Sequence, residues 1–102
     1  MIVNTITGVG AHLSAAHRDI DSGKLHGHTW EIVAWFPYKP GVNALDLQVR
    51  LKKLLAEWDH DVIPDRLATA EELAIQIGFH LMGCVAVDVS RRSDRLFARW
   101  AR

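Results

Sequence analysis

The chain has 102 residues, of which 49% are hydrophobic, and its formal net charge is zero. This length suits one domain with a modest core, and we expect residues 1–102 to form a single domain. A balanced charge argues against nucleic acid or an anionic membrane as a partner. The sequence has no basic, apolar leader and no run of about eighteen apolar residues, so we expect a cytoplasmic protein without a membrane span.

The only cysteine, Cys84, excludes an intramolecular disulfide and a zinc site built from cysteines. Its neighbours, residues 82–87, are mostly apolar. We therefore expect an inert, buried thiol.

Two strands are predicted in the first 38 residues. The first is rich in β-branched residues over positions 2–8 and is expected to continue to His17, with bends at Gly8 and Gly10. The second, over residues 28–38, is rich in aromatic and β-branched residues. An antiparallel hairpin of these strands, connected by residues 19–23, would bring His17 back to the start of the second strand.

Two helices follow. The first is predicted from Ala44 to Glu57 or Trp58, because apolar residues recur there at helical spacing. The second is predicted to begin after Thr69, which forms a capping box with Glu72, and to stop at Gly83. Residues 59–65 connect the two.

The chain closes with two further predicted strands, residues 85–89 and 95–100, joined by a polar turn. The order is then β-β-α-α-β-β. This order predicts an α+β fold in which one four-stranded antiparallel sheet carries two helices on one face. Such a small sheet leaves edges to be covered, which favours a homo-oligomer.

Three histidines cluster near the first hairpin. His26 and His28 are two residues apart and so point to one face of a strand, and His17 would lie beside them. Three neutral imidazoles suit a Zn²⁺ site with an open fourth position, although iron or nickel accepts similar ligands. The alternative is that these histidines are ordinary surface or core residues.

Asp59 and His60 form a second pair, at the end of the first predicted helix. A carboxylate beside an imidazole fixes the ring for proton exchange. The alternative is a histidine that interacts with the helix dipole. His12 and His80 are expected to be structural.

These blocks together resemble the 6-pyruvoyltetrahydropterin and 6-carboxytetrahydropterin synthases. That family reads F-S-A-A-H, C-x-x-L-H-G-H, L-D-H and P-T-x-E-N-L-A in this order. The matching blocks here are L-S-A-A-H at 13–17, S-G-K-L-H-G-H at 22–28, W-D-H at 58–60 and A-T-A-E-E-L-A at 68–74. The resemblance covers almost the whole chain.

The resemblance implies the tunnelling fold, whose units assemble as trimers or hexamers around a β-barrel. It also implies that His17, His26 and His28 hold zinc, which binds the side-chain hydroxyls of a dihydropterin. Asp59 and His60 would exchange protons. The activity would be that of a lyase on dihydroneopterin triphosphate or a related dihydropterin, in pterin or deazapurine (queuosine) biosynthesis.

Two positions depart from the family pattern. Ser22 stands where the family has its catalytic cysteine, and a serine hydroxyl is a much weaker base than a thiol. Arg91, or Val89 with a shift, stands where the family has the glutamate that anchors the pterin. Neither side chain accepts hydrogen bonds as a carboxylate does.

Three hypotheses follow from the sequence. The first is a zinc-dependent 6-carboxytetrahydropterin synthase-like enzyme with Ser22 in the cysteine's place. The second is a zinc-binding relative without synthase activity. The third is an enzyme whose Arg91 and Arg92 face an anionic group of a different ligand.

Overall fold

The computed structural model describes residues 5–18, 22–64 and 69–102, and for Arg18 and His26 it describes the backbone alone. The predicted strand residues 2–4 and parts of the two predicted connections, 19–21 and 65, lie outside this range. The elements are β1 (Ile6–Arg18), β2 (Leu25–Pro37), α1 (Ala44–Leu55), α2 (Ala70–His80), β3 (Ala86–Arg91), a 3₁₀ turn (Arg92–Asp94) and β4 (Leu96–Ala101).

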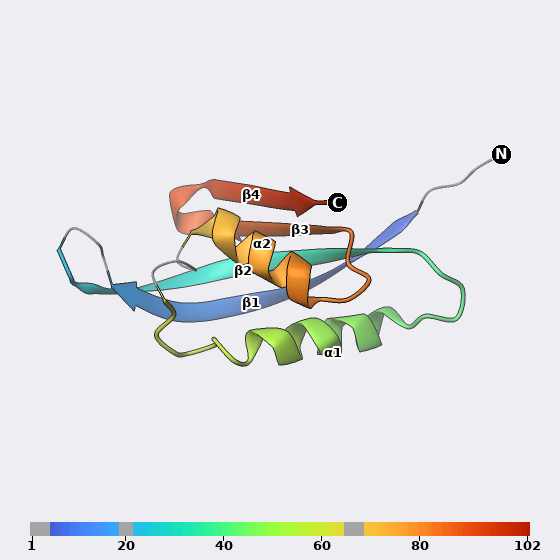
Figure 1. Ribbon diagram of the computed structural model, residues 1–102, viewed down its shortest axis with the longest axis horizontal. Helices are drawn as coiled ribbons and strands as arrows, with labels where there is room; N and C mark the ends of the chain where they lie inside the picture. The colour runs from blue at the N-terminus through green and yellow to red at the C-terminus, as the bar shows by residue number, and fades with distance from the viewer. Residues whose placement is uncertain (1–4, 19–21, 65–68) are drawn as a thin grey trace.

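The four strands form one antiparallel sheet in the order β1-β2-β3-β4. Both helices lie on one side of it, with α1 along β1 and α2 across β3 and β4 (Figure 1). The predicted α+β fold with the order β-β-α-α-β-β is therefore confirmed.

Pairing between β1 and β2 is unbroken from Ile6–Pro37 to Arg18–Leu25, so neither Gly8 nor Gly10 interrupts the strand. Gly8 has a packing role instead. A Cβ at that position would lie 2.8 Å from Cζ3 of Trp35, its neighbour on β2. The glycine lets the indole lie flat against β1.

The hydrophobic core lies between the sheet and the helices. Alternate residues of the strands point into it, as a one-sided sheet requires. Its fully buried members of largest volume are Trp30, Leu13, Ile32, Leu51, Leu73, Ile77, Val87, Val89 and Cys84. Cys84 is a free thiol whose Sγ–H donates to the carbonyl of Ala86, and burial raises its pKa, as expected of an inert thiol.

The helix boundaries differ by a few residues from those predicted. Asn43 and Thr69 cap the two N-termini with their side chains, so the cap predicted at Thr69 is confirmed. The first helix ends at Leu55, before a turn that carries Trp58 and Asp59. The second ends at His80, because Leu81 is already extended; Gly83, with φ of 85°, belongs to the turn beyond.

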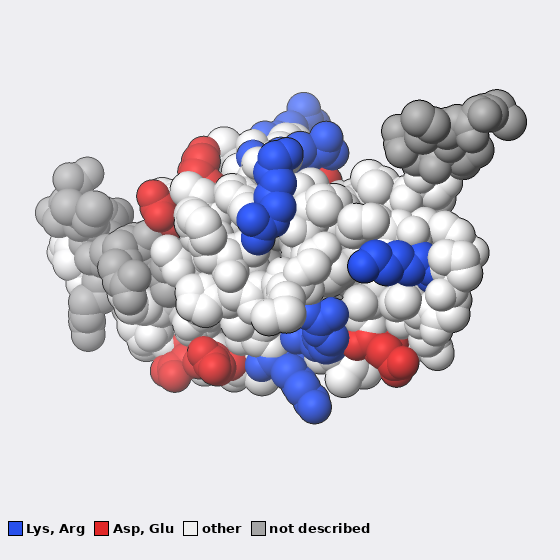
Figure 2. Space-filling view, turned by 45° about the vertical axis from the view of Figure 1, so that its right-hand side comes forward, with Lys and Arg blue, Asp and Glu red and all other residues white. Residues whose placement is uncertain are grey.

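Charged side chains of both signs lie around the face shown in Figure 2, with uncharged residues between them. Neither described helix is long and apolar enough to cross a membrane.

Gly78 gives a direct test of the contact between α2 and β4. An alanine in a helix normally stabilises it by up to about 1 kcal/mol relative to glycine. At position 78, however, a Cβ would lie 2.3 Å from Cε3 of Trp100. We expect Gly78→Ala to lower the free energy of unfolding by about 1–3 kcal/mol, because the ring must move. Urea denaturation would measure this loss.

Gly10→Ala is the matched control. A Cβ at Gly10 meets only the carbonyl oxygen of Ile32, at 3.6 Å. An equal loss in the two variants would contradict the packing role of Gly78.

Candidate metal and proton-transfer site

Two of the three predicted metal ligands lie in direct contact. Nε2 of His17 is 3.0 Å from Nε2 of His28, and the two rings are stacked at 4.9 Å between centroids. His28 also meets the edge of the buried Trp30 ring, at 5.4 Å. The pairing of β1 with β2 places the backbone of His26 directly opposite His17. The hairpin thus brings all three histidine positions to one end of the ribbon.

The histidine pair fits a zinc ion. Two imidazole nitrogens bound to tetrahedral zinc at about 2.0–2.1 Å lie about 3.3 Å apart, close to the spacing found here. Among the described side chains, no set of three His, Cys, Asp or Glu could hold a metal. The side chain of His26 is not among the described side chains, and a site of three histidines would need it as the third ligand.

The predicted proton-transfer pair is formed just after α1. Nδ1 of His60 is 3.0 Å from Oδ2 of Asp59, and the His60 side chain is 82% exposed. The second carboxylate oxygen of Asp59 accepts a hydrogen bond from the main-chain N–H of Ser14, at 2.9 Å. His60 has a left-handed backbone, with φ of 60°, which few residues other than glycine adopt.

The environment of Asp59 favours its charged form. The hydrogen bond from the Ser14 N–H lowers the pKa of the Asp59 carboxyl most, and the neighbouring His60 lowers it further. A carboxylate held in its charged form accepts the Nδ1–H of His60. Nε2 is then the ring nitrogen that is left for proton exchange.

Main-chain hydrogen bonds attach this segment to the exposed edge of β1. His60 N–H donates to the carbonyl of Ser14, and Ala16 N–H donates to the carbonyl of Asp61, at 2.9 Å. Ile63 N–H then donates back to the carbonyl of Ala16, at 2.8 Å. Residues 60–63 therefore act as a short extra strand beside β1, and they hold His60 against the sheet.

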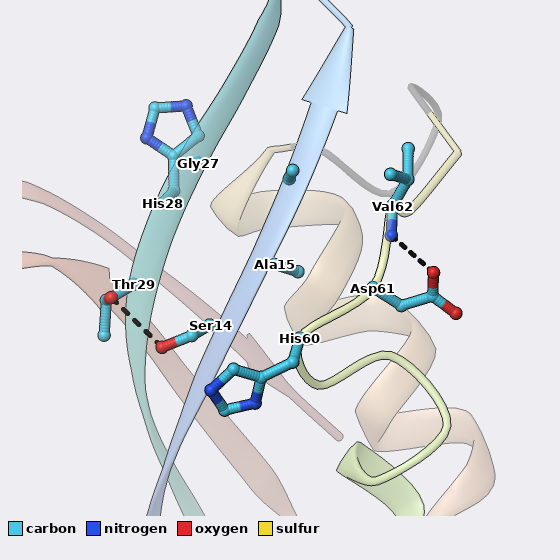
Figure 3. A pocket seen from close by; sticks show the side chains of 9 residues that line it. Ser14, Ala15, Gly27, His28, Thr29, His60, Asp61 and Val62 are labelled. Atoms are coloured by element: carbon cyan, nitrogen blue, oxygen red, sulfur yellow. Dashed lines mark hydrogen bonds between the residues drawn. The ribbon is translucent and has the colours of Figure 1, made fainter.

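A pocket of about 430 Å³ lies where this segment meets the hairpin (Figure 3). His28 and His60, one member of each predicted group, are both among its lining residues; the His28 ring lies on the face of β2 that carries Trp30, and the His60 ring lies beside Ser14. The lining residues are Ser14, Ala15, Ala16, Gly27, His28, Thr29, His60, Asp61 and Val62.

Ser22 is not among the residues that line this pocket. It lies exposed in the connection between β1 and β2, where its Oγ accepts a hydrogen bond from the N–H of Lys24, at 3.3 Å. Within one chain, the hydroxyl expected in the cysteine's place is thus separate from the pocket that His28 and His60 share.

Arg91 lies at the end of β3, and its guanidinium forms an ion pair with Asp94. Its Nε is buried and has no acceptor among the described residues, and the same holds for Nε1 of Trp30. A buried donor without an acceptor costs about 1–3 kcal/mol. Position 91 therefore offers hydrogen-bond donors where a glutamate would offer acceptors. Arg92 points to the other face, where its Nε is 3.4 Å from Glu31.

Sequence reasoning missed the hydroxyl groups of this pocket. Oγ of Ser14 is 3.2 Å from Oγ1 of Thr29, across the β1–β2 pair. The sequence did contain a signal for both residues. Thr29 is next to His28, and Ser14 is three residues before His17, so strand alternation places both hydroxyls on the face opposite the histidines. The pocket extends across that opposite face.

No family model matches the sequence, and no curated protein matches it closely. Solved structures do show its fold. The chain is similar to the structure of Caenorhabditis elegans 6-pyruvoyl tetrahydropterin synthase, with a TM-score of 0.78 and 14% sequence identity. The match covers 99% of this chain and 97% of that chain. The fold implied by the sequence motifs is therefore confirmed.

Stability should depend on the charge of Asp59. Because its pKa in the folded protein is lowered, the carboxylate stabilises the fold above its unfolded pKa of about 3.9. That contribution is lost as the pH falls through the folded-state pKa. We expect Asp59→Asn to lower the free energy of unfolding at pH 6 more than at pH 2.5, as measured by urea denaturation at each pH.

Glu57→Gln, in the exposed turn after α1, is the control for removing one acidic charge from this region. If Asp59→Asn lowered the free energy of unfolding by the same amount at both pH values, this would contradict stabilisation of the carboxylate by Ser14 and His60.

Proposed function

We propose that this chain is a zinc-dependent lyase of the 6-carboxytetrahydropterin synthase type, acting on dihydroneopterin triphosphate or a related dihydropterin. The observation that carries the proposal is the shared pocket. His28, in contact with His17, and His60, in contact with Asp59, both border it. The likeness in fold to a tetrahydropterin synthase over 99% of the chain supports the same proposal.

His17, His26 and His28 would hold the metal. When bound, a zinc ion supplies a Lewis acid that stabilises negative charge developing on the ligand. Zinc is chosen because neutral imidazoles suit it, and metal analysis separates it from iron or nickel.

His60 would move the proton. Its Nδ1 is held by Asp59, so Nε2 takes up a proton from the ligand and returns it. Asp59 orients the ring and is itself held in place by the Ser14 N–H. Ser22 lies in the connection between β1 and β2, outside the pocket, and within one chain it would take part in this proton transfer only from there.

The same proposal includes a cytoplasmic homo-oligomer, a trimer or a hexamer, working in pterin or deazapurine (queuosine) biosynthesis. The sheet gives a physical reason for assembly. At one edge residues 60–63 cover residues 14–16 of β1, whereas β4 at the other edge pairs only with β3 among the described strands. A strand edge of this kind favours pairing with another chain.

A second candidate function is zinc binding without synthase activity, in a ligand-binding or assembly subunit. Two observations favour it. Ser22 does not line the pocket, and Arg91 presents donors in place of a glutamate's acceptors. An altered ligand with an anionic group facing Arg91 or Arg92 is a variant of this candidate.

The first test is metal content per chain together with turnover of dihydroneopterin triphosphate. We expect about one zinc per chain in the wild type, and loss of most of it in His17→Ala, His26→Ala and His28→Ala. In the variants that lose the metal, turnover should fall by at least about a hundredfold.

His12→Ala and His80→Ala are the controls, because His12 lies near Glu31 and His80 contacts the carbonyl of Gln76. Both should keep the metal. Metal without turnover in the wild type would support the second candidate, and a wild type without metal would contradict both candidates.

The two candidates are separated by restoring the family residues. If the chain has diverged from an active enzyme, Ser22→Cys with Arg91→Glu should give turnover where the wild type has none. Mass spectrometry of the products would detect it. Turnover already present in the wild type, and unchanged in the double variant, would instead show that neither position limits the reaction.

A further inference from the structure

The pocket contains a pair of hydroxyl groups for which the proposed chemistry has no role. Ser14 on β1 and Thr29 on β2 are directly opposite in the strand pairing, and their side-chain oxygens are 3.2 Å apart. Ser14 is half-buried, and Thr29 is exposed. Both line the pocket that His60 borders, and Figure 3 shows the two hydroxyls facing each other with the His60 ring beside Ser14.

Ser14 is fixed relative to the proton-transfer pair by its main chain. Its N–H donates to Oδ1 of Asp59 at 2.9 Å, and its carbonyl accepts from the N–H of His60 at 2.5 Å. The Ser14 hydroxyl therefore has a defined position beside the imidazole. A group bound to this hydroxyl is held near the ring that would exchange its proton.

The chemistry of the pair selects a hydroxyl ligand. Each hydroxyl has one donor and two acceptor sites, so their mutual hydrogen bond leaves one O–H donor and three acceptor sites. A ligand hydroxyl, which both donates and accepts, satisfies such a pair. An anionic group is disfavoured, because Asp61 is among the lining residues of the pocket and the carboxylate of Asp59 accepts the N–H of Ser14.

We propose that Ser14 and Thr29 form a subsite for a hydroxyl group of the ligand and position that group beside His60. This inference rests on the proposed function for the identity of the ligand, a pterin with a hydroxylated side chain. Ser14 and Thr29 are positioning and specificity residues here. The pocket's own hydroxyl groups thus come from the strands of the hairpin, not from Ser22 in its connection.

The test compares two probes, neopterin, which carries side-chain hydroxyls, and 6-methylpterin, which does not. Binding is measured by fluorescence titration in the His17→Ala background, because a bound metal would itself favour hydroxyls. We expect neopterin to bind about tenfold more tightly than 6-methylpterin, as one or two net hydrogen bonds to the hydroxyl pair allow.

Ser14→Ala and Thr29→Val should each remove most of this preference while leaving 6-methylpterin binding unchanged. Ser14→Thr and Thr29→Ser keep the hydroxyls and should retain the preference. Ser90→Ala on β3 and Thr7→Val on β1 are the matched controls, because neither residue lines the pocket.

The proposal is overturned if the double variant Ser14→Ala/Thr29→Val keeps the preference, or if Ser22→Ala removes it. It is also overturned if neither pterin binds. Turnover of dihydroneopterin triphosphate by the metal-loaded wild type is measured separately. A hydroxyl preference that depends on Ser14 and Thr29, found without any turnover, supports the subsite and contradicts the proposed enzyme.

Discussion

The attachment of residues 59–63 to the edge of β1 is the constraint on which the rest of the site depends. Without these hydrogen bonds, Asp59 and His60 would lie in an exposed turn after α1 with no fixed relation to the hairpin. With them, a carboxylate, an imidazole and the strand that carries His17 form one rigid group. The main-chain bonds of residues 60–63 and the Asp59 carboxylate, which accepts the Ser14 N–H, achieve this, and the His60 side chain stays available for the pocket.

The same attachment also protects the sheet. An edge strand exposes a row of unpaired N–H and carbonyl groups, which invites wrong pairing. Ser14 and Ala16 have theirs satisfied by the segment, and Gln48 of α1 covers Gly10 by donating to its carbonyl. One feature thus serves both the fold and the candidate site.

Much of this architecture could be predicted from the sequence. Alternation and helical spacing gave the order of the elements, and Thr69 marked the start of α2 because capping is a local interaction. The approach of His17 to His26 and His28 could be predicted as well, since a hairpin of the first two strands brings His17 back to the start of the second strand. Tertiary packing was harder to predict. The role of Gly8 depends on Trp35, which lies 27 positions further along the chain, and nothing local indicates that the two meet.

The candidate site was predictable to a similar degree. Asp59 and His60 were found because they are adjacent in the sequence and match a motif. The Ser14 and Thr29 pair was missed because their proximity follows only from the exact pairing of two strands. Ser22 matched the motif, yet its place in the hairpin connection leaves it outside the pocket, which the sequence alone could not reveal.

The length of the first hairpin has a consequence for the dynamics of the site. β3 pairs with β2 only over Glu31–Trp35, so the end of the hairpin that carries the histidines is a narrow ribbon beyond the sheet, flanked among the described residues only by residues 60–63 beside β1. Such a ribbon opens at a lower free-energy cost than the core unfolds. A ligand that contacts both β1 and β2 there would stabilise the paired state of the ribbon, so part of its binding free energy would go into ordering the two strands. Amide hydrogen exchange in this ribbon would therefore report occupancy of the site while the core stays unchanged.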